Sequence, residues 1–176
     1  MPAILSIIGK SGSGKTTLIE KLIPELKRRG HRIGTIKHTV HDIDLDTRGK
    51  DSWRHKAAGA ESVMLAAPHG VSLVKSLREY ELDDLVGYFD DLDLIITEGF
   101  KRGNRPKIEI FRTSVHREPL FSGGPDLIAM VTDSQAERDI PVFGLDDTAG
   151  LADLIEQNLI SESGWNRQRQ RKNTMG

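Results

Sequence analysis

A glycine-rich segment near the N-terminus has the residue types and spacing of a phosphate-binding loop. Residues 9–16 match the pattern G-x-x-x-x-G-K-[ST]. Its glycines let successive backbone N–H groups point at phosphate oxygens, and we expect Lys15 to reach the β- and γ-phosphates and Thr16 to place its hydroxyl on Mg²⁺. The alternative is a loop that only joins a strand to a helix. The predicted phosphate-binding residues are Gly9, Lys10, Ser11, Gly12, Ser13, Gly14, Lys15, Thr16 and Thr17.

Acidic residues in two segments could complete a magnesium site with Thr16. Glu98 ends an apolar run, where a carboxylate beside a phosphate-binding loop holds a Mg²⁺-bound water; otherwise it is a strand-end acid facing solvent. Asp42, Asp44 and Asp46 alternate with apolar residues and would share one face of an extended chain, either as part of a Mg²⁺ shell or as a solvated edge. Asp42 is the preferred ligand because it lies nearest the preceding strand.

Basic residues follow both strands that end near this site. Lys37 and His38 are predicted to contact phosphate, substrate or a partner, since His38 and His41 lack the further ligands of a zinc site. A second cluster follows Glu98 and could clamp an anionic ligand or partner, or be a solvated loop; its members are Lys101, Arg102, Arg105, Lys107 and Arg112. Asp133 ends another apolar run and is the candidate contact to a nucleotide base.

Alternating strands and helices would position these residues. Leu18, Leu22 and Leu26 lie four apart, which predicts a helix over 17–29 that Gly30 ends. Trp53, Ala57 and Ala60 are predicted to face inward from a helix over 51–60. The other expected helices are 81–89 and one from Asp147 or Thr148 to 159; the expected strands are 3–8, 32–37, 62–66, 71–74, 92–98, 107–112, 127–131 and 141–145. The order predicts an α/β fold with a mostly parallel, doubly wound sheet of the P-loop NTPase type.

Bulk composition limits the function classes. The chain has 176 residues, a net charge of −1 and no cysteine, so we expect no disulfide, thiolate metal site or catalytic thiol. The near-neutral charge gives no reason to expect a nucleic acid or an anionic membrane as partner. Without room for a signal peptide or a membrane-length apolar run, a cytoplasmic protein is expected. Residues 1–160 are predicted to form one nucleotide-binding domain, followed by a disordered basic tail over 161–176.

Several short segments together are more distinctive than the glycine-rich loop alone. They are residues 9–17, 35–39, 49–52, 58–60, 97–101 and 146–153. From about residue 4 to residue 159 the chain resembles the MobB family, the adapters of molybdopterin-guanine dinucleotide biosynthesis. The resemblance implies a homodimer that binds GTP with Mg²⁺, hydrolyses it weakly and works beside MobA, the guanylyltransferase. Whether molybdopterin itself binds is left open.

Other readings of the same residues remain. Lys10 resembles the extra lysine of the ArsA and MinD ATPases, which reaches a partner's nucleotide across a dimer, although Ser11 stands where those loops have glycine. The chain could also be a small-molecule kinase with the basic cluster as acceptor clamp, or a metallochaperone GTPase. No residue stands out as an activator of water or as an arginine finger, so at most slow Mg²⁺-dependent GTPase activity is expected.

Overall fold

The computed structural model describes residues 1–121, 123–134 and 138–160. The chain divides into two compact units, whereas the sequence predicted one domain over 1–160. One, here called the main unit, comprises Met1–His38 and the described residues from Leu85 onward; the other, here called the hairpin unit, is Thr39–Asp84. The tail predicted for residues 161–176 lies outside the described residues.

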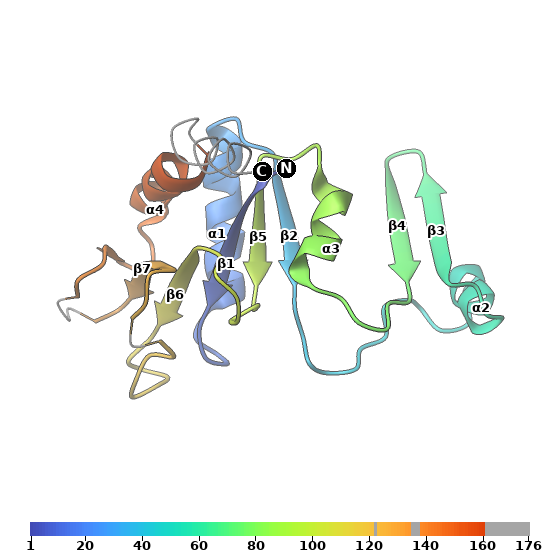
Figure 1. Ribbon diagram of the computed structural model, residues 1–176, viewed down its shortest axis with the longest axis horizontal. Helices are drawn as coiled ribbons and strands as arrows, with labels where there is room; N and C mark the ends of the chain where they lie inside the picture. The colour runs from blue at the N-terminus through green and yellow to red at the C-terminus, as the bar shows by residue number, and fades with distance from the viewer. Residues whose placement is uncertain (122, 135–137, 161–176) are drawn as a thin grey trace, which may run out of the picture. The chain divides into compact units, whose positions relative to one another are not determined.

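Six parallel strands form the sheet of the main unit (Figure 1). Their order is β2 (Ile33–Lys37), β5 (Leu94–Glu98), β1 (Ala3–Ile8), β6 (Lys107–Phe111), β7 (Leu127–Thr132) and β8 (Val142–Phe143). Every neighbouring pair in this sheet is parallel. The predicted fold class is therefore confirmed, with a sheet that is wholly parallel.

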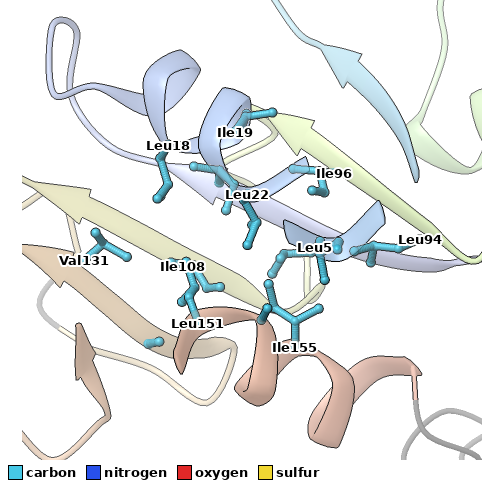
Figure 2. Packing of buried hydrophobic residues seen from close by; sticks show 14 of the residues in the cluster. Leu5, Leu18, Ile19, Leu22, Leu94, Ile96, Ile108, Val131, Leu151 and Ile155 are labelled. Carbon is cyan, nitrogen blue, oxygen red and sulfur yellow. The ribbon is translucent and has the colours of Figure 1, made fainter. Parts of the chain in front are cut away.

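One face of the sheet packs against the helices α1 (Lys15–Arg28) and α4 (Thr148–Ile155) (Figure 2). Leu22 and Leu26 of α1 are fully buried, as the four-residue spacing predicted. The strands contribute alternate residues to this core, among them Leu5, Ile7, Leu94, Ile96, Ile108, Ala129 and Val131. α1 begins at Lys15, two residues earlier than predicted, so Lys15 and Thr16 belong to its first turn.

The opposite face of the sheet is also covered. Gly34 of β2 alternates with Ile33, which packs on the core at the α1 face, so Gly34 points to the other face. A Cβ added at Gly34 would lie 2.6 Å from Cδ1 of Phe89, which ends the short 3₁₀ helix η1 (Gly87–Phe89) after α3 (Leu82–Val86). Because both faces are covered, the strands are apolar at successive positions.

The hairpin unit carries α2 (Asp51–Ala57) and an antiparallel pair, β3 (Ser62–Ala67) and β4 (Gly70–Lys75). Both strands were predicted. The prediction that Ala57 faces inward was wrong, because its side chain is exposed. Trp53 and Ala60 are partly buried. The helix stops at Ala57, so Ala60 lies beyond it, and a seven-residue helix covers too little surface to bury every apolar position.

The C-terminal helix begins where Asp147 accepts a hydrogen bond from the Gly150 N–H at 3.0 Å, which decides between the two predicted caps. After α4 the chain continues in a π-helix, η2 (Glu156–Ile160). β8 is shorter than the strand predicted over 141–145. Across the described ranges, no helix combines the length and the apolar character needed to span a membrane.

Candidate nucleotide-binding site

The glycine-rich loop joins the end of β1 to the start of α1, at the carboxyl edge of the sheet. Gly14 is the N-cap of α1 with φ +97° and ψ +21°, a left-handed conformation that favours glycine. No side chain of the described residues caps this helix end. Its first N–H groups and its dipole are therefore directed at whatever anion the loop holds.

Lys15 lies over the loop that precedes it. Its Nζ donates to the carbonyl oxygens of Gly9 at 3.2 Å and Lys10 at 3.0 Å. Burial lowers the pKa of Lys15, Glu98 partly offsets this, and the positive charges of Lys101 and Lys37 lower it further. Lys15, Lys37 and Lys101 therefore share one electrostatic environment, which favours an anion among them.

Thr16 and Glu98, 82 residues apart in sequence, are in contact. The Thr16 hydroxyl lies 3.1 Å from each carboxylate oxygen of Glu98. The strand pairing brings them together, because β5 neighbours β1 with Glu98 opposite Ile7. The oxygens fit Mg²⁺ in type, and in spacing too, since neighbouring ligands of an octahedral shell at about 2.1 Å from the ion are about 3 Å apart. Thr16 and Glu98 would hold the ion here.

Strained backbone follows Glu98. Phe100 has φ +48°, the only positive φ of a non-glycine among the described residues. Its ring lies 4.6 Å from that of His38, tilted by 48°. The His38 N–H donates to the Glu98 carbonyl at 2.9 Å, and Lys37 Nζ lies 3.8 Å from the Glu98 carboxylate. The structure thus gathers Lys37 and His38 at Glu98, as expected of strands that end side by side.

The basic cluster after Glu98 does not act as one surface. Lys101 and Arg102 are exposed, as a contact to an anion requires. Lys107 is 1% exposed, and its Nζ donates to the carbonyls of Gly103 at 2.7 Å and Arg105 at 3.0 Å and lies 3.4 Å from Asp126. Its predicted place in a clamp is wrong, because these contacts use the ammonium inside the fold.

Two further predicted residues stay predictions. Asp133 follows β7, and its Oδ1 accepts hydrogen bonds from the Thr113 N–H at 2.8 Å and the Thr113 hydroxyl at 2.9 Å. These bonds lower the pKa of Asp133. Asp42 belongs to the hairpin unit, with Asp44 and Asp46. Within the described ranges no three histidine or acidic side chains gather to hold a metal.

A segment from β6 onward contacts the loop and was missed by the sequence reasoning. The His116 ring donates to the Ser11 carbonyl at 2.7 Å. Glu109 is 1% exposed and its carboxylate accepts from the N–H groups of Leu120 and Phe121, while burial raises its pKa. The sequence did contain a signal for this contact: Glu109 is an acid inside an apolar strand, and a buried carboxylate needs hydrogen-bond partners within the protein.

Comparisons with known proteins identify the family. The family model described as "Molybdopterin guanine dinucleotide synthesis protein B", MobB, matches residues 4–133. The chain belongs to the MobB family. The Molybdopterin-guanine dinucleotide biosynthesis adapter protein of Escherichia coli (strain K12) is 37% identical over 170 residues, which are 93% of this chain and 97% of that protein.

Other relatives and solved structures point to the same family. The adapter protein of the same name from Haemophilus influenzae is 40% identical over 156 residues, 87% of each chain. The crystal structure of Bacillus subtilis MobB aligns with a TM-score of 0.70 at 26% identity, over 89% of this chain and 98% of that one. Membership of the MobB family gives the chain a role in molybdenum cofactor biosynthesis, and the resemblance seen in the sequence is confirmed.

Proposed function

We propose that the chain binds GTP with Mg²⁺ and acts as a nucleotide-dependent adapter in molybdopterin-guanine dinucleotide biosynthesis. The contact of Thr16 with Glu98 carries this proposal, because it joins the phosphate-binding helix to a carboxylate on the neighbouring strand. GTP is proposed rather than ATP because the MobB relatives are named for a guanine dinucleotide.

Each group in the site has a distinct part in binding. The backbone N–H groups at residues 9–17 would surround the phosphates, and Lys15 would add a fixed positive charge. Mg²⁺, held by Thr16 and Glu98, would neutralise charge on the phosphates. Asp42 is retained as a proposed third ligand, and Asp133 as a proposed base contact.

We propose that hydrolysis is slow. Glu98 contacts Thr16 and Lys37, which suits a metal ligand more than a base that takes a proton from water. An arginine finger raises such rates by roughly 10³–10⁵, and the part of the chain that the structure describes supplies no evident one beside Glu98. Slow turnover suits a protein whose bound nucleotide determines which partner it contacts.

The proposed partners are a second copy of the chain and a MobA-type guanylyltransferase, in the cytoplasm. The hairpin unit offers apolar surface on both faces of its strand pair, since Met64 (59% exposed) and Val71 (69%) share one face and Leu65 (52%) lies on the other. Two-stranded hairpins are marginal alone, and apolar patches of this kind mark interaction sites. Lys37, His38, Lys101 and Arg102 would contact an anionic ligand, with molybdopterin as one candidate.

A titration with competing nucleotides tests the proposal. Fluorescent GTP is displaced by GTP or ATP, with and without Mg²⁺, for the wild type and Lys15→Ala. We expect GTP to compete better than ATP, Mg²⁺ to strengthen binding, and Lys15→Ala to abolish it. GTP loading should also raise co-purification with the guanylyltransferase; equal recovery with GTP, with GDP and without nucleotide would refute a nucleotide-dependent adapter.

The kinase alternative loses support from the burial of Lys107, which removes one cation from the proposed acceptor clamp. Rapid phosphoryl transfer from GTP to a pterin or nucleoside would nevertheless favour a kinase over an adapter. A titration in which the chain binds a transition metal more tightly than Mg²⁺ would favour the metallochaperone alternative.

A further inference from the structure

Strand β6 extends past the end of β1 and along the glycine-rich loop. Its register pairs Ser6 with Lys107 and Ile8 with Glu109, and β1 ends at Ile8 while β6 continues to Phe111. The last two residues of β6 therefore lie beside the loop. A Cβ added at Gly9 would lie 2.5 Å from the Ile110 carbonyl oxygen, which shows how closely the two backbones approach.

Arg112 follows directly and lies against the start of α1. Its Cδ is 3.9 Å from the position of a Cβ added at Gly14, the N-cap of α1. The backbone beyond it is fixed, because Thr113 donates from both its N–H and its hydroxyl to Asp133. Arg112 also helps to lower the pKa of Asp133. The side chain thus lies near both the phosphate-binding loop and Asp133.

The guanidinium of Arg112 has an unused donor in this position. Its Nε is buried and has no hydrogen-bond partner among the described residues. Buried donors normally have partners, and an arginine presents five N–H groups in a rigid plane. That plane suits either a phosphate, which can accept two parallel hydrogen bonds, or the face of a purine, on which it can stack.

The order of the strands decides which end of a nucleotide Arg112 would meet. Glu98 lies on β5, to one side of β1, and with Thr16 marks where Mg²⁺ and the terminal phosphates belong. Arg112 follows β6, on the other side of β1, and Asp133 follows β7 beyond it. A polyphosphate along the loop therefore has its nucleoside end toward Arg112.

We infer that Arg112 is a nucleotide-binding residue that contacts the nucleoside end of the bound nucleotide, beyond its phosphates. This rests on the proposed nucleotide binding and adds a group on the side opposite Glu98. Arg112 then contributes equally to binding a nucleoside triphosphate or diphosphate, and nothing to binding inorganic tripolyphosphate. A cation that contacted the γ-phosphate would instead favour the triphosphate.

The test uses the full chain with three probes: GTP, GDP and tripolyphosphate, each titrated with Mg²⁺. The variants are Arg112→Ala and Arg112→Lys. Arg117→Ala is the control, because Arg117 is exposed and its replacement removes the same charge from the same segment. We expect Arg112→Ala to weaken GTP and GDP binding alike by about 10- to 100-fold, the range for lost hydrogen bonds to charged groups. Tripolyphosphate affinity should stay within about twofold.

Arg112→Lys keeps the charge but loses the planar group, so it should recover only part of the affinity for both nucleotides. Thermal unfolding by circular dichroism shows whether each variant is folded; if Arg112→Ala is not, Arg112→Lys decides. Unchanged GTP and GDP binding overturns the inference, as does equal loss for all three probes, loss for GTP alone or the same loss in Arg117→Ala. A wild-type chain that binds none of the probes overturns the proposed function as well.

Discussion

Replacing Gly9 by alanine tests the close approach of β6 to the glycine-rich loop. The new Cβ would lie 2.5 Å from the Ile110 carbonyl oxygen and 2.6 Å from the Ser13 hydroxyl oxygen. Carbon–oxygen contacts are normally about 3.3 Å or longer, so the backbones must separate by about 0.8 Å. Such overpacking costs about 1–3 kcal/mol. Because Ile110 presents backbone here, a side-chain rotation cannot relieve it.

Gly30→Ala is the matched control. Gly9 has φ +152° and Gly30 φ +94°, so both variants strain the backbone, but a Cβ at Gly30 meets nothing within 4 Å. The control therefore costs only the left-handed conformation, about 1–2 kcal/mol. We expect Gly9→Ala to lower the free energy of unfolding by about 1–3 kcal/mol more than Gly30→Ala, which corresponds to about 2–12 °C in Tm.

Urea unfolding followed by circular dichroism measures this difference for the wild type and both variants. The m-values should agree, so that midpoints report stability. If Gly9→Ala and Gly30→Ala lose the same free energy within about 0.5 kcal/mol, the tight contact with Ile110 is not present in solution and the reasoning fails. Greater loss in Gly9→Ala should be accompanied by weaker nucleotide binding, because the displaced loop presents its N–H groups wrongly.

Three other predictions concern charged groups. Glu98→Gln should weaken nucleotide binding about tenfold or more with Mg²⁺ and not in EDTA, because a neutral amide is a poorer ligand; titrations showing equal loss in both conditions would contradict a metal role. Since the pKa of Lys15 is lowered, its positive charge is lost as pH rises, and the nucleotide affinity should fall at a lower pH than an ordinary lysine would give. The Lys15→Arg variant keeps its charge and should show no such fall in the same titration. Arg28 and Arg29 lower the pKa of Glu25 to about 2, so its stabilisation is present above the unfolded-state value and lost as pH falls toward about 2. Acid unfolding of Glu25→Gln should show less pH dependence in that window than the wild type, whereas equal slopes would refute the linkage.

Much of the fold could be predicted because the signals are local. β1 has the predicted bounds, and Leu18, Leu22 and Leu26 face the core as their spacing requires. The glycine-rich loop was recognisable because all its phosphate-binding groups lie within nine residues of each other. The position of Glu98 was predictable by the same means, since an acid that ends an apolar strand must lie at the carboxyl edge of a parallel sheet.

The misses share a physical cause. Lys107 and Arg112 belong to one basic run, yet the first is buried among carbonyls and the second lies beside Gly14. Which of them can reach a ligand depends on where β6 starts relative to β1, and no neighbouring residue encodes that register. Similarly, an exposed Ala57 cannot be distinguished from a buried one by helical spacing when the helix has only seven residues.

By itself the sequence determined the glycine-rich loop between a strand and a helix, the α/β class and the family, because each rests on residue types at fixed spacing along the chain. Only the tertiary structure decided that Thr16 meets Glu98, that His116 donates to the loop, and that Arg112 lies on the side away from Glu98. These contacts join residues roughly 80 to 105 positions apart. Strand order and register create them, through hydrogen bonds between backbones that carry no residue-specific signal.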